Sequence, residues 1–153
     1  MVGIQRIKKI TFFKDFSEDE IGKIASILSE KNYKKNAVIL EEGSPEQGLH
    51  IIEHGKVRVT RKTSEDLKQT FAVLKENNFF GELSFMDGRE HSASVEVLED
   101  TKVLVLMKSD MEKLLQEDPQ TAYKIVRKMI IDICEILRDM NNKFMNLSSY
   151  IWE

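Results

Sequence analysis

The pattern of apolar and polar positions changes twice along the chain and divides it into three zones. In the first zone, Ser17 and Glu20 have the spacing of a capping box, in which each side chain binds the other residue's backbone N–H. The apolar residues that follow recur at helical intervals. This pattern predicts a helix over about residues 18–30, within an N-terminal helical segment of residues 10–31.

The middle zone, residues 32–107, shows short apolar or alternating runs separated by turn residues such as His54-Gly55 and Glu99-Asp100. The runs expected to form strands are Ala37–Glu41, Leu49–Glu53, Lys56–Lys62, Gln69–Leu74, Ser92–Leu98 and Lys102–Met107. Short strands with closely spaced turns are typical of a barrel, sandwich or roll. We therefore expect an α+β, mainly β domain whose body is a β-roll.

The third zone is helical again, over residues 109–147, and is followed by a short tail of residues 148–153. Ser109 and Glu112 predict a second capping box. Asp118-Pro119 predicts that one helix ends and another begins, because proline suits the first position of a helix. No glycine or proline interrupts the chain after that point, which predicts one long helix.

The long helix carries two apolar stripes. The first is Ala122, Val126, Met129, Ile133, Ile136, Met140, Phe144 and Leu147, and the second is Ile125, Ile130, Cys134 and Leu137. One stripe can cover the roll, but a small roll offers little surface to a helix of roughly 40 Å. The spacing resembles a coiled-coil seam, so we expect a homodimer through this helix. Burial of both stripes against one monomer is the alternative.

Composition and charge exclude several classes of protein. The 153 residues are 41% hydrophobic and 32% charged, which fits one globular domain. A net charge of −3 without a basic stripe predicts no nucleic-acid binding. No apolar run is long enough for a membrane span, and a single cysteine fits the cytoplasm. The chain has no nucleophile elbow, P-loop or dinucleotide fingerprint, so we do not expect an enzyme.

No metal site or cofactor is expected either. His50 and His54 lie on one face of a strand, but Glu53 points the other way, and a metal needs more converging ligands. Cys134 has apolar helix neighbours, which favours interface packing over a reactive thiol.

The segment Phe79–Val95 carries the candidate chemistry. Gly81 opens one turn of helix, where unpaired backbone N–H groups favour an anion, and its lack of a side chain admits a ligand close to the backbone. Glu82, at the start of that turn, can accept a hydrogen bond from a sugar hydroxyl. Ser92 can donate one to a phosphate oxygen. The alternative for Glu82 is a capping carboxylate with no ligand.

This segment resembles the phosphate-binding cassette of cyclic-nucleotide-binding domains, the family of the catabolite activator protein and of the regulatory subunits of cyclic-nucleotide-dependent kinases. The matching residues are Phe80-Gly81-Glu82-Leu83, Asp87-Gly88 and Ser92-Ala93-Ser94-Val95, with Glu42-Gly43-Ser44-Pro45 and Leu49–Val59 resembling the first hairpins. The resemblance covers about residues 10 to 147. It implies an eight-stranded double-stranded β-helix, or jelly roll, with an N-terminal helix and a long C-terminal helix.

The resemblance also implies a ligand site. Its residues would be Gly81, Glu82, Leu83, Ser84, Arg89, His91, Ser92, Ala93, Ile136 and Leu137. Gly81 and Glu82 match the positions that pack under the ligand and bind the ribose hydroxyl, and Ser92 matches the residue that faces the phosphate. Ile136 and Leu137 fall near the positions at which the catabolite activator protein reads adenine, so the base would meet an apolar lid here.

The chain departs from the family pattern at the phosphate. His91 stands where the family has arginine, Glu90 stands where it has proline, and Arg89 comes two residues too early and is expected to be an exposed turn residue. Arginine is permanently charged, whereas histidine, with an ordinary pKa of about 6.5, is mostly neutral at pH 7. Two interpretations stay open: a degenerate pocket, or phosphate binding that strengthens from pH 7.5 to 6.

The sequence therefore predicts a non-enzymatic sensor module. It would bind cyclic AMP, cyclic GMP or another small anionic ligand between the cassette and the long helix, and relay binding through that helix. The alternative is a vestigial pocket on a constitutive dimerisation or protein-docking module, with Tyr150 and Trp152 as part of the docking surface. No helix-turn-helix follows the long helix, so we expect the output to run through the dimer or a protein partner.

Overall fold

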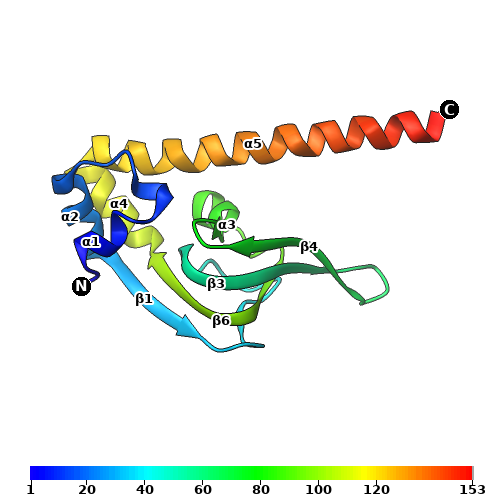
Figure 1. Cartoon of the computed structure of the whole chain (residues 1–153), viewed down its shortest axis with the longest axis horizontal. Coiled ribbons are helices and arrows are strands. Elements are labelled where there is room, and N and C mark those ends of the chain that lie inside the picture. Colours follow the sequence, from blue (N-terminus) through cyan, green and yellow to red (C-terminus); the bar gives the residue numbers. More distant parts are fainter. Residues whose placement is uncertain (153) are drawn as a thin grey trace.

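One antiparallel sheet forms the body of the protein, and helices gather at one end of it in the computed structural model, which describes residues 1–152 (Figure 1). The elements in chain order are α1 (Ile4–Ile7), the 3₁₀ turn η1 (Thr11–Phe13), α2 (Glu18–Ile27), β1 (Leu28–Tyr33), β2 (Val38–Leu40), β3 (Leu49–Lys62), β4 (Lys68–Lys75), β5 (Phe79–Phe80), α3 (Glu82–Asp87), β6 (Ser94–Leu106), α4 (Lys108–Glu117) and α5 (Pro119–Trp152). The helix α5 begins at the helical end and runs past the roll (Figure 1).

The sheet has the order β1-β6-β3-β4, with β2 added to β6 and β5 added to β3. Every pairing is antiparallel. The strands β3 and β6 form the centre, where their register runs from Leu49 opposite Leu106 to Thr60 opposite Ser94. The β-roll is confirmed, whereas the predicted count of eight strands is not, because the described chain forms six.

The strand count differs because two predicted turns are bends inside continuous strands. At Gly55 the backbone has a φ of 106°, and a Cβ atom there would lie 2.7 Å from the Asp100 carbonyl oxygen. The register between β3 and β6 shifts around this point without breaking the ladder. Each of the two strands therefore replaces two predicted runs. The polar strand β1 was not predicted, since it follows α2 directly and exposes most of its residues.

The first predicted capping box is confirmed and the second is wrong. The Ser17 hydroxyl accepts a hydrogen bond from the Glu20 N–H, and the Ser17 N–H donates to the Glu20 carboxylate. The helix α2 ends at Ile27, three residues before the predicted end. Ser109 lies inside α4, which begins at Lys108 after an N-cap, Met107, that makes no side-chain hydrogen bond.

The predicted break at Asp118-Pro119 is confirmed. Asp118 caps the start of α5, because its carboxylate accepts hydrogen bonds from the Thr121 N–H at 3.1 Å and from the Thr121 hydroxyl at 2.7 Å. The helix continues through Trp152, so the residues predicted as a tail are helical as far as the structure describes them. Before α2, the short elements α1 and η1 are further helical turns that the sequence pattern did not predict.

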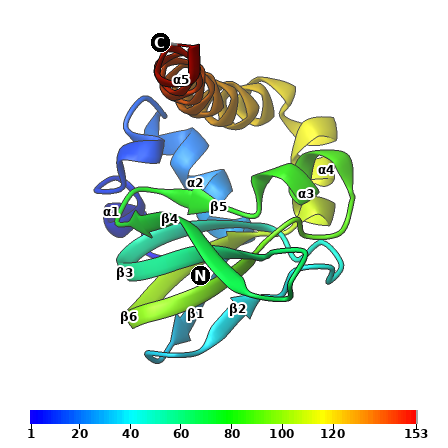
Figure 2. The same ribbon diagram turned by 90° about the vertical axis from the view of Figure 1, so that its right-hand side faces the viewer.

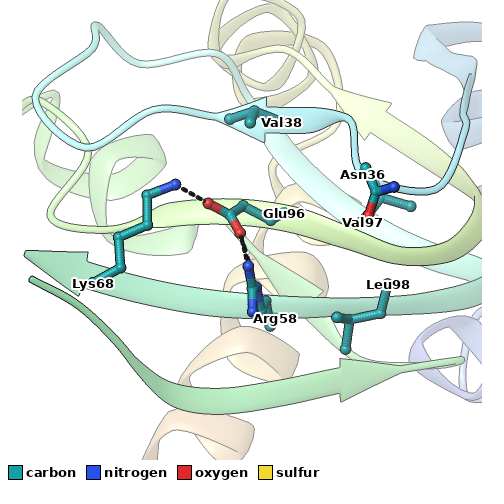
Figure 3. A pocket seen from close by; sticks show the side chains of 7 residues that line it. All are labelled: Asn36, Val38, Arg58, Lys68, Glu96, Val97 and Leu98. Atoms are coloured by element: carbon teal, nitrogen blue, oxygen red, sulfur yellow. Dashed lines mark hydrogen bonds and ion pairs between the residues drawn. The ribbon is translucent and has the colours of Figure 1, made fainter.

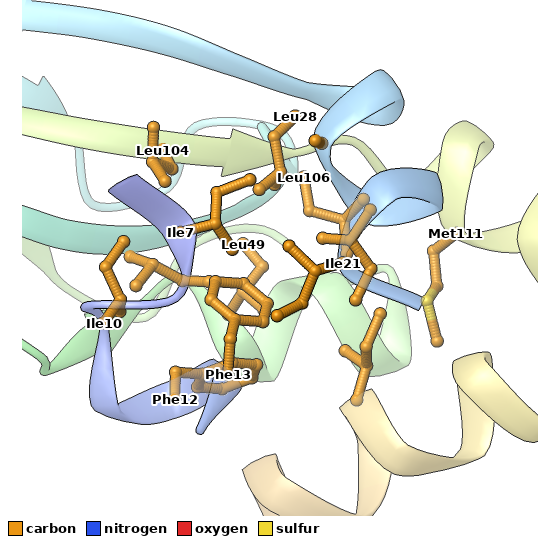
Figure 4. Packing of buried hydrophobic residues seen from close by; sticks show 14 of the residues in the cluster. Ile7, Ile10, Phe12, Phe13, Ile21, Leu28, Leu49, Leu104, Leu106 and Met111 are labelled. Atoms are coloured by element: carbon orange, nitrogen blue, oxygen red, sulfur yellow. The ribbon is translucent and has the colours of Figure 1, made fainter. Parts of the chain in front are cut away.

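Two apolar cores lie on opposite faces of the central strands. Val103 and Val105 of β6 face the inside of the roll, whereas Leu104 and Leu106 face the helices, because side chains alternate along a strand. The helical core also holds Phe13 and side chains of α1, α2 and α4 (Figure 4). The helices therefore pack on one end of the sheet, and the loops lie at the other end of the roll.

Only the first turns of α5 are packed. Its buried residues are Thr121, Ala122, Ile125 and Met129, and from residue 130 to 152 no side chain is buried. Ion pairs from Lys124 to Glu20 at 2.8 Å and from Lys23 to Asp118 at 2.5 Å hold the same end against α2. The expectation that one apolar stripe covers the roll along the helix is therefore wrong beyond Cys134, because Ile133 and Cys134 are half-buried and the apolar side chains that follow are exposed.

Replacing Ser17 by alanine is expected to destabilise the protein by about 1 kcal/mol, because the Glu20 N–H loses its acceptor at the helix start. Urea unfolding followed by circular dichroism measures this. Ser26→Ala is the matched control, since Ser26 is exposed in the same helix and donates only to the Lys23 carbonyl oxygen. An equal loss of stability in both variants would contradict the capping role of Ser17.

Candidate functional site

The cassette helix α3 is framed by two glycines in the left-handed conformation, Gly81 with a φ of 79° and Gly88 with a φ of 72°. A Cβ atom on Gly81 would lie 2.8 Å from the Gly48 carbonyl oxygen and 3.6 Å from Nδ1 of His50. Only glycine therefore fits here, because of its close contact with the loop before β3, and the predicted close approach of a ligand stays a prediction. No side chain caps α3, so its first N–H groups have no side-chain acceptor.

Glu82 begins α3 and is half-buried. In the described chain its carboxylate accepts no hydrogen bond from another residue, and burial raises its pKa above the ordinary value. A hydrogen bond from its own backbone N–H opposes this shift but does not outweigh burial. The carboxylate is therefore an available acceptor at the position predicted for the ribose contact.

His91 is buried, with 5% of its surface exposed. Its backbone is fixed to the loop before β3, because the His91 N–H donates to the Ser44 carbonyl at 2.8 Å and the His91 carbonyl accepts from the Gly43 N–H at 2.8 Å. The ring atom Nε2 is buried and has no hydrogen-bond partner. Burial lowers the pKa of the ring, and the carboxylate of Glu46 opposes this shift. His91 is thus a neutral, unsatisfied polar group held in a fixed place.

His50 lies behind the cassette. It is 1% exposed, its ring stacks on Phe80 at 4.9 Å between centroids, and Nδ1 is 3.1 Å from the Gly48 carbonyl oxygen. Because a carbonyl only accepts, Nδ1 carries the proton and donates. Burial lowers the pKa of His50 to about 4, with smaller contributions that include His91. His50 is therefore neutral at physiological pH.

The other predicted cassette residues divide into buried and exposed groups. Ser84 is buried, Ala93 is half-buried, and Leu83 and Ser92 are exposed. Arg89 lies in an exposed turn, where its N–H donates to Asp87 at 2.9 Å and its guanidinium is 3.8 Å from the same carboxylate. This agrees with the prediction that Arg89 is a turn residue.

The structure does not pack the predicted lid over the roll. Ile136 and Leu137 of α5 are 53% and 51% exposed. They lie on the part of α5 beyond Met129 that holds no buried side chain. Figure 2, a view from the C-terminal end of α5, shows that helix above the roll. A contact between these two residues and a base stays a prediction.

Sequence reasoning missed the loop that faces the cassette. Glu46, whose carboxylate accepts a hydrogen bond from the Gly48 N–H, lies near His91, and Gly48 itself touches Gly81. Gly43 and Gly48 both have positive φ, at 83° and 96°. Glycine, proline and glutamate at close spacing predicted a turn here, but no local signal indicated that the turn packs on a segment about 40 residues later in the chain.

A polar hollow of about 350 Å³ lies away from the cassette and is lined by Asn36, Val38, Arg58, Lys68, Glu96, Val97 and Leu98 (Figure 3). At its centre Glu96 is bound by Lys68 and by Arg58, whose Nε is 2.8 Å from the carboxylate. These partners, Lys68 first, lower the pKa of Glu96. The cluster joins β3, β4 and β6, and its two cations share the one carboxylate of Glu96, which leaves it with a net positive charge.

Two further features concern other classes of site. Within residues 1–152, no three histidine, cysteine, aspartate or glutamate side chains converge in a way that suits a metal ion. None of the helices in this range has the length and apolar character that a membrane span requires.

The comparisons with known proteins agree with the cassette geometry. The cyclic nucleotide-binding domain model matches residues 30–118. The chain is 29% identical over 119 residues to the cyclic AMP receptor protein of Thermus thermophilus, which covers 78% of this chain and 55% of that protein. It is 31% identical over 109 residues to the cAMP-dependent protein kinase regulatory subunit of Candida albicans, covering 71% of this chain and 23% of that subunit.

The solved structures show the same fold. A cyclic nucleotide-binding domain from Methylobacillus flagellatus has a TM-score of 0.82 at 25% identity, covering 93% of this chain and 80% of that one. The catabolite activator protein of Thermus thermophilus has a TM-score of 0.77 at 27% identity, covering 90% of this chain and 62% of that one. Because the family model matches more than half of this chain, the chain belongs to the cyclic nucleotide-binding domain family.

Proposed function

We propose that this chain is a non-enzymatic regulatory module that binds a cyclic nucleotide, such as cyclic AMP or cyclic GMP, at the cassette. The observation that carries the proposal is a buried polar atom without a partner, Nε2 of His91, in the segment that also holds Glu82. The carboxylate of Glu82 is half-buried and accepts no hydrogen bond from another residue of the described chain. A sugar hydroxyl and a phosphate oxygen supply the hydrogen bonds that these two groups lack.

Calorimetric titration of the protein with cyclic AMP and cyclic GMP tests the binding. We expect saturable binding of at least one nucleotide in the micromolar range or tighter. No heat with either nucleotide at millimolar concentration would contradict the proposal and would favour the docking function described below.

Glu82→Ala is expected to weaken cyclic AMP binding about 10- to 100-fold, because a hydrogen bond to a charged group contributes about 1.5–3 kcal/mol. The same titration measures this. Glu90→Ala is the matched control, since Glu90 is an exposed cassette carboxylate. Removing a carboxylate by itself favours an anion, so an equal loss in both variants would point to a general disturbance of the cassette and would remove Glu82 from the sugar contact.

A second function is supported by the free half of α5. Exposed apolar side chains continue along it from Ile130 to Trp152. Positions at intervals of four and three, as in a coiled-coil seam, run along this surface. They are the exposed apolar residues Ile130, Leu137, Phe144 and Ile151, with the half-buried Cys134 and Ser148 and the polar Asn141 between them. The occupant that we propose is α5 of a second copy, because a polar Asn within such a seam fixes the register of two like helices.

Nucleotide binding at the cassette and dimerisation through α5 would act together. Nucleotide binding would change the position of α5 relative to the roll, and α5 would transmit the change to the second copy or to a protein partner. A ligand achieves this only through different affinities for the two arrangements. A location in the cytoplasm and the lack of nucleic-acid binding are parts of the same proposal.

A further inference from the structure

The surroundings of His91 carry an excess of negative charge. Along residues 41–48 and 79–91, one arginine and one histidine stand against six carboxylates. These carboxylates are Glu41, Glu42, Glu46, Glu82, Asp87 and Glu90. The arginine, Arg89, is 87% exposed and lies 3.8 Å from Asp87. An anion bound here therefore meets repulsion, and no fixed positive charge of the cassette offsets it.

Two cations outside the cassette lie near it, but one is paired with a carboxylate and the other lies at the end of α3 away from Glu82. Arg61 is 3.9 Å from the carboxylate of Glu42. Lys108 lies beside Gly88, where a Cβ atom would be 3.1 Å from its Nζ, so it sits at the end of α3 opposite Glu82. His91 is thus the one buried group of the cassette that can become a cation.

We propose that His91 takes up a proton from solvent when the cassette binds a cyclic phosphate diester, so that the proton is a co-ligand of the nucleotide. This inference rests on the proposed function and adds a regulatory input to it. The protonated ring would donate from its buried, now unpartnered Nε2 to a phosphate oxygen. The module would then respond to nucleotide and pH together.

The groups that face His91 agree with this role. From the loop, the carboxylate of Glu46 opposes the effect of burial on the ring and so favours its protonation. From β3, His50 is neutral above about pH 4 and adds no competing charge at the pH values of interest. Within the same segment Arg89 and Glu90 are exposed, Glu82 is half-buried at the start of α3, and burial and Glu46 alone account for the pKa shift of His91.

The sign of the pH dependence follows from linkage. Burial lowers the pKa of His91 in the free protein, so the ring is neutral at pH 7.5 before binding. A phosphate oxygen against Nε2 raises that pKa in the complex. Between the free and bound pKa values, affinity rises as pH falls, approaching about tenfold per pH unit for one proton taken up. Below the free pKa the affinity becomes constant.

Calorimetry with cyclic AMP tests the proposal. Titrations at pH 7.5 in buffers with different ionisation enthalpies measure the protons taken up, and titrations from pH 7.5 to 6.0 measure the slope, with circular dichroism confirming that the fold is retained. The chain has three histidines, so ¹³C-labelled histidine also reports by NMR which ring titrates. We expect close to one proton, assigned to the His91 signal.

Three variants show which residue causes the proton uptake and the pH dependence of binding. His91→Gln keeps a neutral donor and is expected to lose both the proton uptake and the pH slope. Lys108→Gln tests whether the lysine at Gly88 anchors the phosphate instead, and is expected to keep both. His54→Gln removes an exposed histidine that pairs with Glu76, outside the cassette, and is also expected to keep both.

The outcomes distinguish the two proposals. Binding with no proton uptake, or uptake that survives in His91→Gln, overturns the role of His91 and leaves the proposed nucleotide binding in place. Binding at pH 6.0 that disappears at pH 7.5 supports both. The absence of binding to either nucleotide at pH 6.0 overturns both.

Discussion

Replacing His91 by arginine is expected to tighten cyclic AMP binding at least tenfold at pH 7.5. The guanidinium is charged at every accessible pH and offers two parallel donors to a phosphate, whereas the buried imidazole of the free protein is neutral. Loss of one member of a buried charge pair costs about 2–5 kcal/mol, which corresponds to tens to thousands of times in affinity. The His91→Arg variant should recover part of that difference.

Calorimetry on the two proteins side by side measures the gain. Glu90→Gln is the matched control, because it also raises the net charge of the cassette by one, but at an exposed position. We expect a small effect there. Equal affinities of His91→Arg and the natural protein would remove position 91 from the phosphate contact. A gain in Glu90→Gln as large as that in His91→Arg would assign the effect to long-range charge.

The double substitution Leu137→Glu and Phe144→Glu is expected to convert a homodimer into a monomer. Both side chains are exposed in the single chain, at 51% and 71%, and lie seven residues apart in the proposed seam. A carboxylate buried at two layers of a coiled coil, opposite its own copy, has neither a partner charge nor water. The fold should survive, because α5 is packed on the roll only up to Met129.

Sedimentation velocity at tens of micromolar protein measures this change, and circular dichroism checks the fold. Glu135→Gln serves as the matched control, since Glu135 is an exposed charged residue directly beside the seam and its loss should leave the dimer intact. A second test is truncation after Asn146, which removes Tyr150 and Trp152. A monomeric natural protein at these concentrations would contradict the proposed occupant of the α5 surface.

The elements that the sequence predicted correctly depend on residues close together in the chain. Ser17 and Glu20 are three positions apart, and Asp118-Pro119 is a single step, so local geometry alone decides both helix boundaries. The second capping box failed because Ser and Glu at the same spacing also occur inside a helix. What starts α4 is the end of β6 at Leu106, which depends on pairing with β3.

The strand count failed for a related reason. His54-Gly55 has the composition of a hairpin turn, but β6 lies alongside both flanking runs and keeps them in one ladder. A turn signal shows that the chain can bend and does not show which strand lies beside the bend. The continuity of β3 and of β6 follows from their pairing with each other, which joins residues 34 to 57 positions apart in the sequence.

The candidate site was found only in part. The family resemblance identified the cassette residues of α3 and position 91. In the structure Nε2 of His91 is buried without a hydrogen-bond partner, and contact of these residues with a ligand stays a prediction. The contributions of Glu46, Gly48 and His50 depend on the packing of a separate loop and strand against Gly81. No periodicity or spacing in a single sequence contains that information.

Under the proposed relay, the partial packing of α5 would let this helix enlarge a small movement at its base. Its base is fixed to α2 by Lys124 and Lys23, while the span from Met129 to Trp152 is free over about 35 Å by the rise of an α-helix. Over that length, a tilt of about 5° at the base moves the far tip by roughly 3 Å. A displacement too small to disturb the core thus becomes, at Trp152, a step as large as a side-chain contact.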